Sequence, residues 1–193
     1  MTVTIKPRLL GLSGSLRQRS YNTAILAALA EVVANEANME LFPLNEVPLY
    51  DEDADTETPP AVIVRLRAAV ASAHGLVIAS PEYNFGISGV LKNALDWISR
   101  PYGKSGLTGK PVLTITSSLA TTGGVRAQAQ LNETLIAIAA QIVLRPQAVI
   151  GSVHTKMTEG RFTDADSIKF LKEGIADLLR DIENYGSAIR EES

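Results

Sequence analysis

Apolar residues along the chain follow two alternating spacings. Short, nearly continuous apolar runs occupy residues 9–12, 39–44, 76–79, 112–116 and 148–150. After each run, apolar residues recur every three or four positions, over residues 25–33, 62–73, 90–98, 131–142 and 168–182. The first pattern is typical of strands buried on both faces, and the second of helices with one apolar side. The sequence therefore predicts five strands and five helices in strict alternation.

This alternation predicts the fold class. Parallel strands joined by helical crossovers form an α/β sheet that is covered on both faces. Five such units favour a doubly wound, parallel sheet of strand order 2-1-3-4-5, which binds its ligand at the carboxyl ends of strands one and three. A length of 193 residues corresponds to about one domain, and no internal repeat or linker divides residues 1–193.

Composition and charge exclude several classes of protein. The chain has no cysteine and two histidines, so we expect no disulfide, no iron–sulfur cluster and no metal site. A net charge of −3 offers no basic surface to nucleic acid or to anionic lipid. The apolar stretches are far shorter than the ~20 residues that span a bilayer, and the first is too short for a signal peptide. We therefore expect a cytoplasmic protein that binds neither nucleic acid nor membrane.

One segment differs from the rest in composition. Residues 43–60, the acidic segment, hold four prolines and six acidic residues but no lysine or arginine. The remainder of the chain is therefore mildly basic. One interpretation is a solvated connection that its prolines keep out of a helix. The other is a rim for an active site or a contact with a partner subunit.

The segment after the first strand, residues 11–22, is rich in hydroxyl groups and carries Arg17 and Arg19. It matches neither the dinucleotide fingerprint nor the P-loop, and a serine-hydrolase elbow fails at its last position. Hydroxyls, arginine and the amides of a helix N-terminus together bind a terminal phosphate well. The structural alternative is that Ser20 or Asn22 is a plain N-cap beside two solvated arginines.

The segment after the third strand, residues 80–86, offers different chemistry. Its turn begins at Pro81 and presents Tyr83 and Asn84. Backbone amides, an amide side chain and an aromatic face together suit a flat heterocycle with a polar edge.

These segments resemble the NADPH-dependent FMN reductase family, the flavodoxin-like group that includes quinone, chromate and azo reductases. The resemblance rests on Gly14-Ser15-Leu16-Arg17 with Ser20 and Asn22, on Pro81-Glu82-Tyr83-Asn84, and on residues 89–97. It covers nearly the whole chain. It implies a flavodoxin-like three-layer sandwich in which residues 1–193 form a single FMN-binding domain.

The resemblance also implies which residues contact FMN. Around the phosphate it places Ser13, Ser15, Arg17, Ser20 and Asn22. Along the isoalloxazine ring, largely through backbone amides, it places Pro81, Glu82, Tyr83 and Asn84. From the segment after the fourth strand it adds Ser117, Ser118, Thr122 and Gly123. Tyr83 and Asn84 are expected to position the ring for catalysis.

The activity that this resemblance implies is an NAD(P)H-dependent, FMN-containing oxidoreductase. It would pass two electrons to quinone, azo, nitro, metal-oxyanion or free flavin acceptors, with NADPH or NADH as donor and FMN as the reactive group. One alternative is a flavodoxin-type electron carrier without its own substrate turnover, for which a net charge of −3 is weakly acidic. Another is a ligand-binding or regulatory module without redox chemistry.

The resemblance further implies a homodimer or homotetramer that acts on a small-molecule electron acceptor. The family forms dimers across the helix at residues 90–98. Residues 95–98 and the acidic segment are therefore expected to contact a partner. Trp97 itself fits either an interface or plain core packing.

Overall fold

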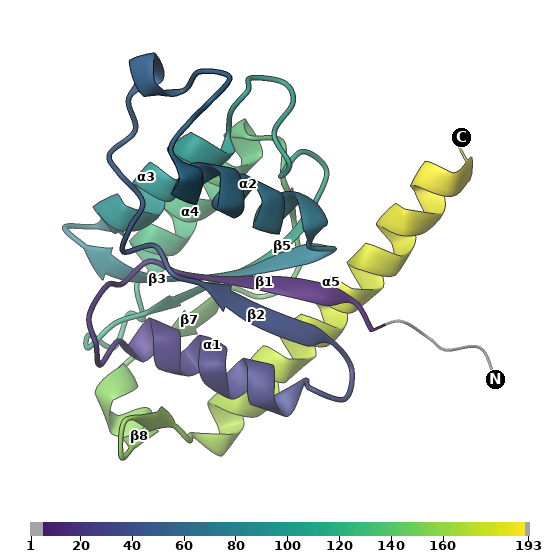
Figure 1. Cartoon of the computed structure of the whole chain (residues 1–193). Helices are drawn as coiled ribbons and strands as arrows, with labels where there is room; N and C mark the ends of the chain where they lie inside the picture. The colour runs from purple at the N-terminus through teal and green to yellow at the C-terminus, as the bar shows by residue number, and fades with distance from the viewer. Residues whose placement is uncertain (1–5, 192–193) are drawn as a thin grey trace.

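The fold is one sheet between two layers of helices (Figure 1), and the computed structural model describes residues 6–191, with side chains as far as residue 185. Four parallel strands lie in the order β2 (Asn38–Phe42), β1 (Arg8–Ser13), β3 (Gly75–Tyr83) and β5 (Pro111–Ser117). The far edge consists of β6 (Gln141–Ile142) and β7 (Ala148–Ile150), which both pair with β5. The predicted order is confirmed, with the fifth strand divided in two.

Helices cover both faces of this sheet. On one face lie α1 (Tyr21–Val32) and α5 (Ala165–Glu191), and on the other lie α2 (Ala61–Ser72), α3 (Gly89–Ile98) and α4 (Val125–Ala137). The short elements are the 3-10 helices η1 (Glu52–Ala54) and η2 (Val153–Lys156), and the strands β4 (Gly86–Ile87), β8 (Met157–Thr158) and β9 (Arg161–Phe162).

The two core clusters follow from the alternation of side chains along each strand. In β1, Leu9 packs with α1 and α5, whereas Leu10 and Leu12 pack with the helices of the other face. In β3, Val77 and Leu76 divide in the same way. Side chains alternate across a strand, so a continuous apolar run supplies both layers at once.

The predicted fourth helix is wrong at its end. The stripe at 131–142 includes Ile142, but α4 ends at Ala137 and Ile142 lies in β6. Ala139 adopts a left-handed backbone with φ of 62°, which an α-helix cannot continue. Ile142 is apolar because it belongs to the sheet.

The third strand is longer than its apolar run predicts. It continues through Pro81 to Tyr83, and the chain then turns back so that Glu82 and Tyr83 pair with Ile87 and Gly86 of β4. What the sequence predicted as a loop is therefore a short antiparallel hairpin, residues 82–87.

The acidic segment is tied to the helices behind it. The carbonyl of Pro48 accepts hydrogen bonds from Asn93 Nδ2 (2.8 Å) and Trp97 Nε1 (2.9 Å). The ring of Tyr50 meets the indole edge-on, with centroids 4.9 Å apart. Asp55 pairs with Arg67 through two hydrogen bonds of 2.8 Å. These contacts make the segment a fixed part of the structure rather than a free connection.

Trp97 belongs to the core of the chain. Its side chain is fully buried, as are those of Leu95 and Ile98. Core packing is therefore the correct interpretation of Trp97. A partner subunit cannot reach residues 95–98 through these three side chains.

Candidate functional site

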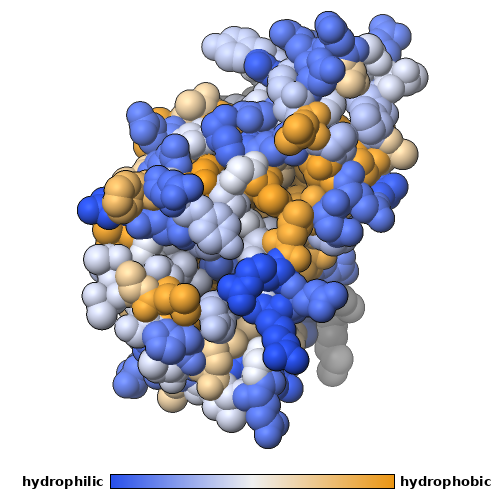
Figure 2. Space-filling view, turned by 90° about the vertical axis from the view of Figure 1, so that its left-hand side faces the viewer, coloured by the Kyte–Doolittle hydropathy of each residue, from blue (hydrophilic) through white to orange (hydrophobic). Residues whose placement is uncertain are grey.

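The predicted site loops meet at the carboxyl ends of the strands, on the left of Figure 1. They are the first loop (residues 14–20, after β1), the hairpin (residues 82–87, after β3) and the third loop (residues 118–124, after β5). Figure 2 shows this end of the molecule as a mixed surface, with apolar patches beside strongly hydrophilic ones.

The first loop is anchored at its start and unpaired beyond it. Gly14 donates its N–H to the carbonyl of Ala79 (2.8 Å), and a Cβ at Gly14 would lie 2.9 Å from Ser88 Oγ, so a larger residue would have to displace the hydroxyl that caps α3. Within residues 6–191, no hydrogen bond is made by the backbone N–H groups of Ser15, Leu16, Gln18 and Arg19. Free amides leading into a helix N-terminus form a ready-made site for an anion.

The predicted phosphate residues take different positions around this loop. Ser13 Oγ lies 2.8 Å from Thr23 Oγ1, and Ser20 caps α1 by accepting the N–H of Thr23 at 3.2 Å. The N-cap interpretation of the Ser20 hydroxyl is therefore correct. Arg17 is exposed, with its guanidinium carbon 5.6 Å from the centre of the Tyr21 ring. Ser13, Ser15 and Arg17 all line one cavity of about 500 Å³.

Asn22 and Ser117 come together from segments 95 residues apart. The Ser117 hydroxyl donates to Asn22 Oδ1 at 3.0 Å, and each residue is only 3% exposed. This contact joins the start of α1 to the end of β5. It therefore ties together the two elements next to the first and third loops.

The hairpin presents its aromatic residues at a tight turn. Asn84 and Phe85 both have positive φ, 49° and 67°, as a two-residue hairpin turn requires. Tyr83 exposes half of its surface and Phe85 rather more. Pro81, by contrast, is buried in β3.

The side chain of Glu82 has a structural role beside the predicted backbone role of this residue along the ring. Its carboxylate accepts the N–H groups of Arg126 (3.0 Å) and Ala127 (3.1 Å) and so caps the N-terminus of α4. Gly124 precedes this helix and has no side chain with which to cap it. A glycine at the N-cap position indicates that the hydrogen-bond acceptor for the first N–H groups of α4 comes from another part of the chain.

In the third loop, close packing explains the glycine at position 123. Gly123 has φ of 64°, and a Cβ there would lie 2.9 Å from the backbone of residues 149–151. Its contact is therefore with the end of β7. Ser118 Oγ accepts the N–H of Ala120 at 3.1 Å, while Thr122 is exposed.

These groups fit FMN. Free amides, hydroxyls and Arg17 suit a dianionic phosphate, and the half-exposed Tyr83 suits a flat ring. At Gly124, a Cβ would lie 3.2 Å from Thr116 Cβ, where the buried Thr116 hydroxyl has no partner among the described residues. The missing side chain at Gly124 lets a ligand come close to the backbone, and the Thr116 hydroxyl offers that ligand a polar group at the strand ends. Among the described residues no cluster of side chains suits a metal ion, and no helix is long and apolar enough to cross a membrane.

Comparison with known proteins agrees with this geometry. Residues 7–155 match the family described as NADPH-dependent FMN reductase. An NAD(P)H-dependent FMN reductase of Pseudomonas aeruginosa is 34% identical over 172 residues, which cover 89% of this chain and 92% of the relative. A quinone reductase of Escherichia coli is 36% identical, over 79% of this chain and 81% of the relative.

The chain belongs to the NADPH-dependent FMN reductase family. The predicted enzyme class and its cofactors, FMN and NAD(P)H, are confirmed with it. Among solved structures, the flavoenzyme NAD(P)H:(acceptor) oxidoreductase FerB of Paracoccus denitrificans superposes with a TM-score of 0.83 at 28% identity, covering 93% of this chain and 98% of FerB. A WrbA-like flavodoxin of Agrobacterium tumefaciens, at 17% identity and a TM-score of 0.57, shares the fold.

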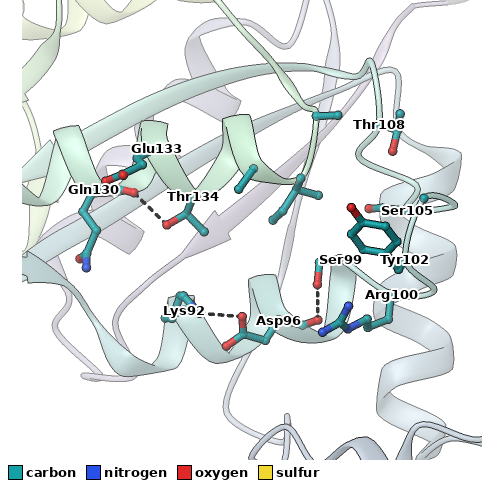
Figure 3. A pocket seen from close by; sticks show the side chains of 14 residues that line it. Lys92, Asp96, Ser99, Arg100, Tyr102, Ser105, Thr108, Gln130, Glu133 and Thr134 are labelled. Atoms are coloured by element: carbon teal, nitrogen blue, oxygen red, sulfur yellow. Dashed lines mark hydrogen bonds and ion pairs between the residues drawn. The ribbon is translucent and has the colours of Figure 1, made fainter.

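A separate cavity lies away from these loops. It occupies about 590 Å³ between α3 and α4, and Figure 3 shows Lys92 and Asp96 of α3 facing Glu133 and Thr134 of α4, with Tyr102 closing one end. The residues predicted for FMN do not line it. It is therefore distinct from the predicted flavin site.

Proposed function

We propose that this reductase passes two electrons from NAD(P)H to a quinone-type acceptor, with FMN held at the carboxyl edge of the sheet by the three loops. The proposal rests chiefly on the first loop, whose unpaired amides lie beside Arg17. The names of its relatives, a quinone reductase among them, support the acceptor class. FMN, when bound, supplies the two-electron chemistry between nicotinamide and acceptor.

In this proposal the chain's own residues bind and orient rather than react. The first loop and Arg17 hold the phosphate, and the buried Asn22–Ser117 contact keeps the first and third loops in register. Tyr83 and Asn84 position the ring from the hairpin. In the overall reaction, NAD(P)H and one proton from water reduce a quinone to its hydroquinone, and NAD(P)H is oxidised to NAD(P)⁺.

Reconstitution with FMN tests this function. We expect a protein with a visible flavin spectrum that NADPH bleaches and a quinone restores. A flavin spectrum that NADPH leaves unchanged supports the electron-carrier alternative instead. Failure to retain FMN supports a ligand-binding module and contradicts the proposal.

We also propose that the reductase works as a dimer or larger assembly in the cytoplasm. The groove between α3 and α4 (Figure 3) carries charges of both signs: Lys92, its ion-pair partner Asp96 and Arg100 on one side, and Glu133 on the other. A second copy could match these charges in the reverse order. Light scattering at working concentration tests the assembly, and a fully active monomer contradicts it.

A further inference from the structure

The tip of the hairpin carries an aromatic residue in an unfavourable backbone conformation. Phe85 has φ of 67°, in the left-handed region where the Cβ of a bulky residue meets the backbone. Glycine is the usual residue at this turn position. Phe85 is also 69% exposed, so core packing does not explain its presence. Strain of this kind in an exposed aromatic residue is typical of functional positions.

The guanidinium of Arg126 covers one side of this ring. Its carbon lies 4.2 Å from the ring centroid, a close cation–π contact. The Arg126 side chain is exposed and, within the described part of the chain, makes no ion pair or hydrogen bond. Its N–H donors and the opposite face of the Phe85 ring are therefore both available to a ligand.

Both residues are held in place by the elements that carry them. Glu82 fastens the hairpin to the first turn of α4, and Gln130 Oε1 accepts the N–H of Ile87 at 2.7 Å. At Gly86 a Cβ would lie 2.5 Å from that same Gln130 oxygen, so the hairpin lies directly on α4. The ring and the cation therefore keep a fixed relation before any ligand arrives.

Phe85 and Arg126 come just after the two segments proposed to border the flavin ring, the hairpin residues Tyr83 and Asn84 and the third loop. Phe85 comes directly after Tyr83 and Asn84, and Arg126 begins α4 after the third loop. The Phe85–Arg126 contact thus bridges the hairpin and the third loop at the mouth of the site. A group bound there lies beside the proposed flavin ring.

We propose that Phe85 and Arg126 form the acceptor-binding surface of this reductase and select flat aromatic acceptors that carry a carboxylate or sulfonate. The inference rests on the proposed function and names its substrate class. The aromatic ring of the acceptor stacks on Phe85, and its anionic group accepts hydrogen bonds from Arg126. A quinone of this kind gains two electrons and two protons, from NAD(P)H and one proton of water, while its anionic substituent is unchanged.

The first experiment measures kcat/KM of the FMN-loaded enzyme for a naphthoquinone and for the same naphthoquinone bearing a sulfonate. In Arg126→Gln we expect the ratio of sulfonated to unsubstituted quinone to fall about tenfold, as for the loss of one charge-assisted contact. Arg126→Lys should recover part of the ratio because it keeps the charge. Arg65→Gln, which removes an exposed arginine from α2, is the matched control and should leave the ratio at the parent value.

The second experiment tests whether the Phe85 ring binds the acceptor or only stabilises the fold. In Phe85→Gly we expect the Tm to rise by roughly 2–4 °C, because glycine relieves the left-handed strain. The kcat/KM for both quinones should meanwhile fall by about threefold or more, because the stacking face is lost. A ring that served only the fold would instead lower the Tm and leave turnover alone.

The outcomes distinguish this inference from the function beneath it. A parent enzyme that reduces both quinones, with the ratio unchanged in Arg126→Gln and turnover unchanged in Phe85→Gly, overturns the acceptor surface and leaves the proposed function standing. A parent enzyme that oxidises NAD(P)H with neither quinone overturns the proposed function and the acceptor surface together.

Discussion

The first loop and the acidic segment leave the carboxyl ends of neighbouring strands, β1 and β2, yet they use their polar groups in opposite ways. In the acidic segment, the carbonyl of Pro48 and the carboxylate of Asp55 each bind partners on α2 or α3. In the first loop, four backbone amides have no partner within residues 6–191. Leu16, Gln18 and Arg19 are exposed, so these amides are open to solvent and can donate to a ligand without breaking a contact of the fold.

The comparison separates structural from ligand-binding residues. Contacts of the acidic segment should matter for the free energy of unfolding and little for FMN. Contacts of the first loop should matter for FMN and little for unfolding.

The largest effect is expected for Trp97→Ala. The indole is fully buried against the acidic segment, so its removal should lower the free energy of unfolding by about 3–5 kcal/mol and the Tm by roughly 6–20 °C. Thermal unfolding measures this loss. FMN affinity below the transition should stay close to that of the parent.

The dependence on protein concentration provides the control. A core residue gives the same Tm loss at every protein concentration, whereas an interface residue gives a loss that changes with concentration. A Tm loss that depends on protein concentration would show that Trp97 lies in a subunit interface and would contradict core packing.

The second effect is expected for Arg17→Ala. A charge-assisted contact contributes about 1.5–3 kcal/mol, so FMN binding should weaken by roughly ten- to a hundredfold. Riboflavin lacks the phosphate and should bind the variant as it binds the parent. Fluorescence titration with both flavins measures the two affinities. If the ratio of FMN affinity to riboflavin affinity is the same in Arg17→Ala as in the parent, the phosphate is not bound at the first loop.

A smaller loss of stability is expected for Asp55→Asn. The Arg67–Asp55 side chains retain 22% and 11% exposure, so the loss should be about 1–2 kcal/mol, below that of a fully buried pair. Chemical denaturation measures it. Glu57→Gln removes an exposed acid from the same segment and should stay within about 0.5 kcal/mol of the parent. Equal losses in the two variants would mean that net charge, not the Arg67 contact, holds the segment.

The sequence predicts the sheet and its helices because burial decides which positions are apolar. Leu9, Leu10 and Leu12 are apolar because β1 lies between two helical layers. Features set by distant partners are not predicted. The end of α4 at Ala137 is followed by β6, which pairs with β5, and the continuation of β3 through Pro81 to Tyr83 depends on pairing with β5 and β4.

The site divides in the same way. Residue types at strand ends point to the first loop and the hairpin, and the Asn22–Ser117 contact unites two predicted positions. The sequence predicts Glu82 along the ring largely through its backbone, and does not predict that its carboxylate caps α4. Gly123 packs on the end of β7. Neither contact is visible in local sequence, because each partner lies more than one element away.

The smallest effect is expected for Arg19→Ala, and it sharpens the comparison within the first loop itself. Arg19 is exposed and makes no ion pair among the described residues, and its side chain is not among those that line the cavity with Arg17. We expect FMN affinity to fall by less than about threefold, as for a solvated charge near the site. Salt provides a second measurement, because the Debye length shrinks from about 10 Å at 0.1 M to about 3 Å at 1 M. Raising salt should therefore weaken FMN binding in the parent and in Arg19→Ala, and should weaken it less in Arg17→Ala, where the charge being screened is already gone. If Arg19→Ala instead matches Arg17→Ala in both affinity and salt response, the phosphate is held by the general charge of the loop rather than by Arg17.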